Sequence, residues 1–295
     1  MRSIALAAGM VCLTATANAQ IPPPPAAAAG FTTVLFQTDF AALSDLVGVL
    51  SCAGAPQTAP WKQALWWEGE SDPSGVAPCG QISLVGDAVF GHQVLDLAWL
   101  AAGNHDDFDA TAISTFPLDT VSPHFAFRHG YVEVELRLAT AAPGVYGGTW
   151  TWGDTSVIFS NTPPFQNLVP AAEFDIAEFG VPPGSPIWFD AAIHEWYAAP
   201  TGGWLAGPMV FDVTQPHRYG LLWTAGGQWQ SGQVCSYIDD QWQGCQPTTA
   251  ASEAGQEFLI MTMGVACNWQ KGDRSCIGGL QRADLLVSRI TVWGE

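Results

Sequence analysis

Short runs of strand-like sequence, separated by turn-forming clusters, dominate this chain. Residues 131–138 alternate apolar and polar side chains over eight positions, which would place one face of a strand on a core and the other in solvent. Residues 284–293 (DLLVSRITVW) are rich in β-branched and large apolar residues, whereas residues 181–186 (VPPGSP) break helices and form turns. Because long helical periodicity and internal repeats are not apparent, the sequence predicts an all-β sandwich or jelly roll.

The first thirty residues differ from the rest. Arg2 precedes an apolar stretch and the small-residue site Ala17-Asn18-Ala19, so residues 1–19 are predicted to be a secretory signal peptide rather than a buried strand or helix. Residues 20–30 (QIPPPPAAAAG) are expected to form an extended linker that takes no part in the core. No second linker follows, so residues 31–295 are predicted to form a single domain.

Composition limits the partners of the mature protein. The chain has 27 acidic and 9 basic side chains, a formal net charge of -18, and 48% hydrophobic residues. This hydrophobic content excludes disorder as the main description, and the negative charge excludes a nucleic-acid partner. No later run is apolar enough to cross a membrane, so we expect a soluble, secreted monomer, located outside the cell or in a periplasm.

Six cysteines remain after the predicted signal peptide, and an even number in an oxidising compartment suggests disulfides. Sequence proximity favours three pairs, but six cysteines allow fifteen pairings and the sequence does not choose among them. No spacing typical of a zinc site accompanies these cysteines. The favoured pairs are Cys52 with Cys79, Cys235 with Cys245, and Cys267 with Cys276.

Three acids stand among apolar neighbours in residues 171–180 (AAEFDIAEFG), with no Lys or Arg within thirty residues on either side. In a regular strand Glu173 and Asp175 share a face, whereas Glu178 points to the other. One extra residue in a β-bulge near Ile176 or Ala177 would return Glu178 to the shared face.

Three converging carboxylates would have unlike pKa values, because burial and mutual repulsion raise some of them. One protonated acid beside one ionised base is what cleavage of a glycosidic bond requires. The alternative is an edge strand whose acids face water and discourage aggregation.

The segment from Glu173 to Glu178 resembles the active-site strand of glycoside hydrolase family 16, with the pattern E-[hydrophobic]-D-[hydrophobic]-x-E of its bulged, laminarinase-like branch. The resemblance implies a concanavalin-like β-jelly roll of two antiparallel sheets. It also implies that Glu173 is the nucleophile, that Glu178 is the general acid/base, and that Asp175 hydrogen-bonds Glu173 and tunes its charge.

Further blocks match the family in the same order along the chain. Residues 127–138 (FRHGYVEVELRL) resemble its F-x-Y-G-x-x-E-x-R-x-K strand, and residues 217–224 (HRYGLLWT) resemble its F-H-x-Y-x-x-x-W-T block. The remaining matches are residues 144–150, 193–196, 237–240, 258–263 and 268–269. Departures from the family are Tyr146 and Val169, where Trp is usual, and Ser288, where an Asp often helps to bind calcium. The resemblance therefore implies no cofactor and makes a structural calcium ion doubtful.

Fourteen tryptophans exceed the usual need of one core, and indole rings stack well on sugar rings. Any one tryptophan, however, is more often buried in the core than exposed as a platform for a sugar ring. We predict substrate binding by residues in the matching blocks, with His194 assigned only through the resemblance. The predicted set is Trp150, Trp152, His194, Trp196, Asn268 and Trp269.

The predicted function is that of a secreted, retaining endo-β-glucanase that hydrolyses laminarin-type β-1,3-glucan. A strongly acidic chain with few cations favours a neutral polysaccharide over sulfated or uronic-acid polymers. Alternatives that remain open are a transglycosylase or an agar-type galactan hydrolase that uses the same carboxylates, and a glycan-binding module without catalysis.

Overall fold

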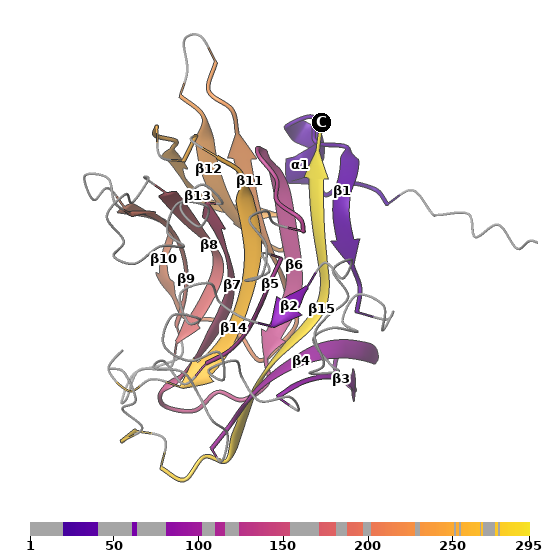
Figure 1. Ribbon diagram of the computed structural model, residues 1–295, viewed down its shortest axis with the longest axis vertical. Coiled ribbons are helices and arrows are strands. Elements are labelled where there is room, and N and C mark those ends of the chain that lie inside the picture. Colours follow the sequence, from indigo (N-terminus) through magenta and orange to yellow (C-terminus); the bar gives the residue numbers. More distant parts are fainter. Residues whose placement is uncertain are drawn as a thin grey trace, which may run out of the picture.

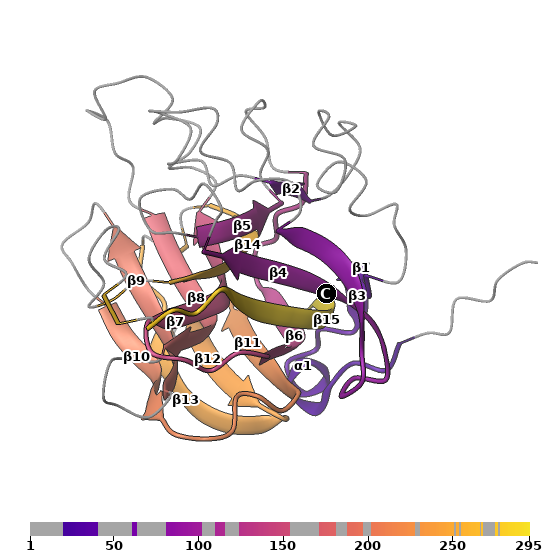
Figure 2. The same ribbon diagram turned by 90° about the horizontal axis from the view of Figure 1, so that it is seen from below.

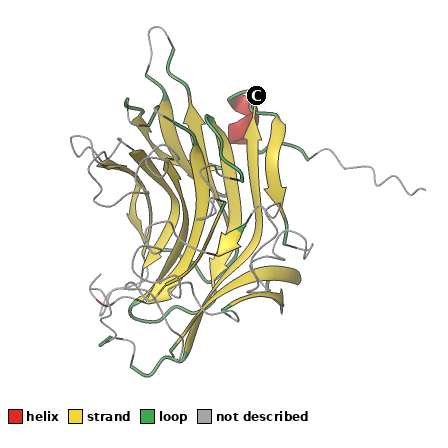
Figure 3. Ribbon diagram, viewed as in Figure 1, coloured by secondary structure: helices red, strands yellow, loops and turns green. Residues whose placement is uncertain are grey.

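Strands make up most of the described chain, as the alternating runs predict (Figure 3). In this computed structural model, the only helix in the described part is α1 (Pro24–Ala28), and it is too short to cross a membrane. The described residues are 20–40, 61–63, 81–101, 110–115, 124–153, 171–180, 188–196, 202–227, 231–250, 252–253, 255–265, 267, 275–276 and 278–295. The predicted signal peptide lies outside these ranges.

Two antiparallel sheets pack face to face (Figures 1 and 2). The first has the order β13-β12-β11-β6-β15-β4-β3, with β1 also paired to β15. Its strands are β1 (Thr33–Thr38), β3 (Ile82–Asp87), β4 (His92–Leu100), β6 (Gly130–Leu138), β11 (His217–Thr224), β12 (Gln233–Ile238), β13 (Gln241–Pro247) and β15 (Arg282–Gly294). The predicted sandwich of two antiparallel sheets is confirmed.

The second sheet has the order β10-β9-β8-β7-β14-β5-β2, so β8 lies near its middle (Figure 2). Its strands are β2 (Lys62–Gln63), β5 (Ala110–Ser114), β7 (Val145–Gly153), β8 (Ala171–Gly180), β9 (Trp188–Trp196), β10 (Gly202–Met209) and β14 (Glu257–Val265). The acidic segment of the sequence is therefore a central strand, not an edge strand.

The predicted alternation of β6 holds on its inner face and differs on its outer face. Val132 and Val134 are fully buried in the core between the sheets. On the outer face Glu133 is only 4% exposed, because its carboxylate lies 3.7 Å from Arg218 and 3.6 Å from Arg289. Two arginines thus cover a position that the pattern assigns to solvent.

The N-terminal segment is not the extended linker that its Pro/Ala composition predicts. Residues Pro24–Ala28 form α1, beside the C-terminal end of β15 (Figure 1). Ala26 and Phe31 are buried and pack with Tyr131 and Trp293 in one apolar cluster. The prediction is wrong because the outer face of the first sheet exposes aromatic side chains here, and the Pro/Ala segment covers them.

Two of the favoured disulfides are present. Cys235 and Cys245 face each other across β12 and β13, and Cys267 pairs with Cys276. The remaining favoured pair, Cys52 with Cys79, lies outside the described residues.

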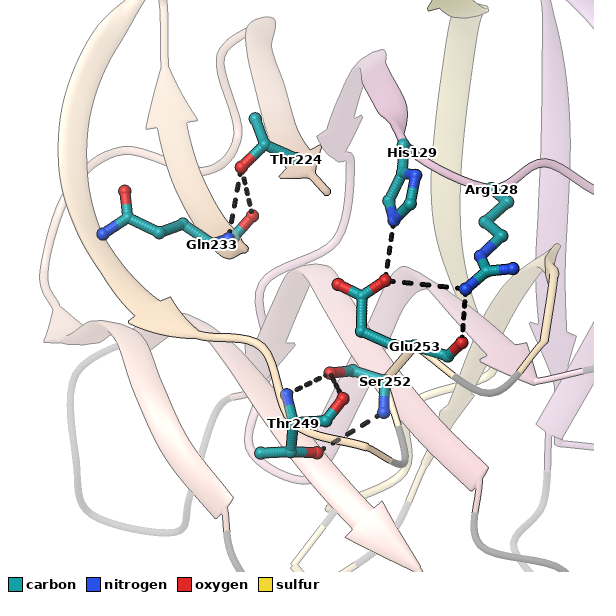
Figure 4. Close-up of polar contacts among 7 residues, drawn as sticks. All are labelled: Arg128, His129, Thr224, Gln233, Thr249, Ser252 and Glu253. Atoms are coloured by element: carbon teal, nitrogen blue, oxygen red, sulfur yellow. Dashed lines mark hydrogen bonds and ion pairs between the residues drawn. The ribbon is translucent and has the colours of Figure 1, made fainter. Parts of the chain in front are cut away.

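Contacts at one end of the sandwich tie the two sheets together (Figure 4). The Arg128 guanidinium donates a hydrogen bond of 2.6 Å to the Glu253 carbonyl oxygen, and His129 Nε2 lies 2.8 Å from the Glu253 carboxylate. Next to them, the backbones of Phe127 and Glu257 exchange hydrogen bonds of 2.9 and 2.8 Å. These contacts place the start of β14 beside the start of β6.

Replacement of Phe31 by Ala tests whether the N-terminal segment belongs to the core. Phe31 is 4% exposed, so the variant should lose about 3–5 kcal/mol of unfolding free energy. Ile21→Ala is the matched control, because Ile21 is 88% exposed in the same segment. Urea unfolding of both variants measures the difference, and equal stability of the two would show that the segment does not stabilise the fold.

Candidate active site

A β-bulge interrupts β8 at the position that the sequence predicts. On β7, Thr149 lies opposite Ala177 and the next residue, Trp150, lies opposite Asp175, so Ile176 has no partner there. The register with β9 also shifts, between Phe174 and Glu178. Both neighbouring strands therefore accommodate one extra residue in β8, and the predicted bulge is confirmed.

The bulge separates the side chains of β8 by polarity. Phe174, Ile176, Ala177 and Phe179 are buried in the core between the sheets. In a regular strand without the bulge, Glu178 would share the face of Phe174 and enter this core. The bulge turns Glu178 to the opposite face, away from the core.

Glu173, Asp175 and Glu178 lie together on that opposite face. Glu173 is directly across from His194 of β9, and paired residues of neighbouring strands share a face. His194 Nε2 lies 3.1 Å from Asp175 Oδ2, and potential ligand atoms of His194, Asp175 and Glu178 all lie within 4.8 Å of one another. The structure thus brings the three predicted carboxylates and the predicted histidine into one site.

Burial raises the pKa values of two carboxyls of this site. Asp175 is 1% exposed, and burial, followed by the charges of Glu178 and Asp190, raises its pKa well above the usual range. Burial also raises the pKa of Glu178, although a hydrogen bond with Asp190 and the charge of His194 oppose the shift. The site therefore retains protons at pH values where exposed carboxyls have lost them.

Trp150 and Trp152 lie beside the carboxylates on β7, opposite Asp175 and Glu173 respectively. Their ring centroids are 6.1 Å apart at an interplanar angle of 79°. Trp152 is only 6% exposed and packs with Phe258, whereas Trp150 is partly buried against the same apolar cluster. Trp150 therefore presents more surface to a ligand than Trp152.

The other predicted binding residues lie wholly or partly outside the described part of the chain. Trp196 ends β9, opposite Ala171, but its side chain is not described. Asn268 and Trp269 lie outside the described residues. Their predicted roles in substrate binding stay predictions.

Two residues that the sequence reasoning missed lie on the same face. Asp190 of β9 is directly opposite Glu178 and is 1% exposed. Trp204 of β10 lies opposite Ala192 of β9, two positions from the residue opposite His194, and is 54% exposed. The period of two from His194 through Ala192 to Asp190 could have indicated the first, whereas the second depends on the pairing of β9 with β10.

The atoms of Asp175, Glu178 and His194 are also close enough to surround a cation. His194 Nε2 contacts one Asp175 oxygen, and Glu178 hydrogen-bonds Asp190. At the doubtful calcium position, the Ser288 hydroxyl donates a 3.1 Å hydrogen bond to Glu135 and lies 2.9 Å from His92 Nε2.

The fold is that of the β-jelly-roll class, a two-sheet sandwich with a carboxylate-bearing strand in the middle of one sheet. No family model matches this chain, and no curated protein matches it by sequence. Solved structures do match in fold, and many of them are described as glycoside hydrolases of family 16 or as laminarinases.

Three of these structures illustrate the likeness. The family 16 protein of a Bacteroides ovatus mixed-linkage glucan PUL, in complex with a product, has a TM-score of 0.58 at 15% identity, covering 88% of this chain and 99% of that one. The endo-1,3-β-glucanase (laminarinase) catalytic domain of Thermotoga petrophila has a TM-score of 0.56 at 13% identity, covering 89% and 98%. An endo-β-galactosidase of Clostridium perfringens that releases GlcNAcα1-4Gal has a TM-score of 0.61 at 14% identity, covering 93% and 65%. At these identities the comparison establishes the shared fold.

Gly148 provides a test of the bulge. It lies opposite Glu178, and a Cβ at this position would be 2.3 Å from the Ala177 carbonyl oxygen and 3.2 Å from the Glu178 Cα, both backbone atoms. Gly148→Ala should therefore push β7 and β8 apart, cost about 1–3 kcal/mol of stability, and reduce glycan cleavage by displacing Glu178.

The matched control is Gly86→Ala on β3, where no atom lies within 4 Å of the added Cβ. Thermal unfolding and release of new reducing ends measure both effects. A Gly148→Ala variant with normal stability and activity would show that β7 does not need to approach β8 so closely.

Proposed function

We propose that this chain is a secreted, retaining endo-β-glucanase of the laminarinase-like branch of glycoside hydrolase family 16, acting on β-1,3-glucan. The observation that carries the proposal is the bulge at Ile176, which gathers Glu173, Asp175 and Glu178 on one face of a central strand. The fold shared with laminarinases and endo-glucanases supports it. The proposal explains why a strand would carry three acids that burial makes costly.

Hydrolysis proceeds by two displacements in this proposal. Glu173 attacks the anomeric carbon while Glu178 gives its proton to the departing glycosidic oxygen, which breaks the bond and leaves a glycosyl ester on Glu173. Glu178 then takes a proton from water, the water oxygen bonds to the anomeric carbon, and Glu173 is released as a carboxylate. The sugar keeps its original configuration.

The protonation pattern supports these roles. Burial raises the pKa of Glu178, which favours the protonated form that the first displacement requires. Burial also raises the pKa of Asp175 well above its usual range, and its hydrogen bond with Glu173, which opposes that rise, holds the nucleophile in place. His194, 3.1 Å from Asp175, holds that side chain in place.

The face around the carboxylates suits an extended neutral glycan. Trp150 lies next to Asp175 on one neighbouring strand, and Trp204 lies two strands away on the other side, about 10 Å across the sheet. Their rings would stack on the C–H faces of sugars on either side of the cleavage point. Trp152, Trp196, Asn268 and Trp269 complete the proposed binding set. The net charge of -18 disfavours anionic polysaccharides.

Export is part of the proposal, with residues 1–19 as a cleaved signal peptide. The two disulfides of the described chain support an oxidising compartment. We propose that the mature protein acts as a monomer on polysaccharide outside the cell or in a periplasm.

A second candidate substrate is a galactose-containing glycan, favoured by the fold shared with the Clostridium perfringens endo-β-galactosidase at a TM-score of 0.61. New reducing ends from laminarin, lichenan, agarose, carrageenan and a GlcNAcα1-4Gal-capped glycan, assayed in parallel, separate the two candidates. Product analysis with added sugar acceptor separates hydrolysis from transglycosylation. Glycan binding without any cleavage would replace the enzyme proposal with a binding module.

Glu173→Gln should abolish detectable turnover, because the amide cannot attack the anomeric carbon, while the melting temperature stays close to that of the native chain. Glu135→Gln on β6 of the other sheet is the matched control and should retain activity. Added azide, with an aryl β-glucoside as substrate, distinguishes the nucleophile from the acid/base. Glu173→Gly should yield the α-glycosyl azide, and Glu178→Gly should yield the β-glycosyl azide. Near-normal laminarin hydrolysis by Glu173→Gln would show that the roles are misassigned.

Trp204→Ala should raise KM for polysaccharide about tenfold, the equivalent of about 1.4 kcal/mol of lost stacking, and leave kcat within about twofold. Trp204 is 54% exposed, so little stability is at stake. Trp242→Ala on β13 of the other sheet, 62% exposed, is the control. If the two variants show the same KM, Trp204 does not contact substrate.

A further inference from the structure

Asp190 adds a fourth carboxyl to the site. It lies on β9 directly opposite Glu178 of β8, and side chains in such pairs have Cβ atoms about 4.5–5.5 Å apart. The two carboxyls are hydrogen-bonded to each other. Asp190 is 1% exposed, so it is fixed within the sheet surface while Glu178 retains access to solvent.

Two acids of the first sheet pair with arginine. Asp96 of β4, also 1% exposed, pairs with Arg282, and Asp87 pairs with Arg137. Burial and the charge of Asp284 raise the pKa of Asp96 to about 7 although Arg282 opposes the rise, whereas at Asp87 burial is outweighed by Arg137 together with backbone hydrogen bonds, which lower the pKa.

Asp190 has a different environment. The titratable groups of the described chain that face it are Glu178 and Asp175 on β8, and His194 lies further along the same face of β9. On its other side β10 contributes no titratable residue. A carboxyl buried beside two others, with no arginine or lysine of the described chain in contact, is stable when protonated and able to donate its hydrogen.

We propose that Asp190 is a positioning residue for the general acid/base: its protonated carboxyl donates a hydrogen bond that orients Glu178 and stabilises the carboxylate formed when Glu178 has protonated the leaving oxygen. This inference rests on the proposed function of Glu178. Asp190 keeps its own proton throughout, so each displacement balances with Glu178 alone giving and regaining a proton.

The electrostatics of the pair are consistent with a fixed donor. Burial, the charge of Glu178 and the hydrogen bond to it raise the pKa of Asp190 to about 8. The same hydrogen bond opposes the rise in the pKa of Glu178 that burial causes. Below about pH 8 the proton therefore stays on Asp190, and Glu178 is the carboxyl that loses and regains a proton during the reaction.

Asp190→Ala and Asp190→Asn separate this role from simple packing. Asn supplies an N–H donor of similar shape and should retain kcat/KM for polysaccharide within about threefold. Ala has no donor and should lose at least tenfold, a part of the roughly 100- to 10,000-fold that acid–base catalysis supplies. Because an aryl glycoside with a good leaving group needs little protonation, its kcat/KM should fall less than threefold in the Ala variant.

Asp96→Asn is the control, because it neutralises an equally buried carboxyl on the other sheet. It should change stability without altering the dependence of rate on the leaving group. Equal losses for Asn and Ala, or equal losses on both substrates, would overturn the donor role.

Unfolding measurements test the proton on Asp190 without using activity. The pKa of Asp190 rises from 3.8 to about 8 on folding, so its contribution to stability is complete below pH 3.8 and is lost as the pH rises through about 8. The melting temperature of the native chain should therefore fall as the pH rises towards 8. Asp190→Asn should remove the part of this fall that the ionisation of Asp190 causes. If the native chain cleaves no glycan, the proposed function fails while this measurement still decides the protonation of Asp190. An unchanged pH dependence in Asp190→Asn would overturn the proposal.

Discussion

One extra residue in the central strand β8 places three carboxyls on the outer face of the second sheet. In a regular β8, Glu178 would share a face with Phe174 and enter the core between the sheets. The bulge at Ile176 turns it to the face of Glu173 and Asp175, and both neighbouring strands shift register to allow it. Gly148 provides the space on β7, because no larger residue fits against the bulged backbone. A local insertion thus creates a polar site on one face while the other face packs the core.

The two sheets bury acidic groups in different ways. In the first sheet, Glu133 and Asp96 are accompanied by arginines, and these ion pairs belong to the structure of the sheet. In the second sheet, Glu178 and Asp190 lie against each other, and burial raises the pKa of each. Burial raises the pKa values of Glu133 and Asp96 as well, but their arginines oppose the rise, whereas no arginine of the described chain opposes it at Glu178 and Asp190. This contrast distinguishes a candidate catalytic site from structural acids more clearly than the number of acids does.

Sequence reasoning succeeded where a pattern depends on neighbours along the chain. The inner face of residues 131–138, the bulge in residues 171–180 and the pairing of Cys235 with Cys245 are local features, and the structure has all of them. It failed where a segment meets a distant surface. The Pro/Ala segment packs on the outer sheet because Tyr131 and Trp293 form an apolar patch there, which composition cannot show. Glu133 is buried because Arg218 and Arg289 reach it from two other strands.

By itself, the sequence determined the two-sheet β class and the identity of the three clustered acids, since strand periodicity and turn residues act over a few positions. Only the tertiary structure placed Asp190 opposite Glu178 and Trp204 on the same open face. The physical reason is that strand order and register are set by core packing and by hydrogen bonds between segments far apart in the chain. A side chain's partner across a sheet is therefore decided by the whole fold, and the protonation of a buried carboxyl depends on that partner.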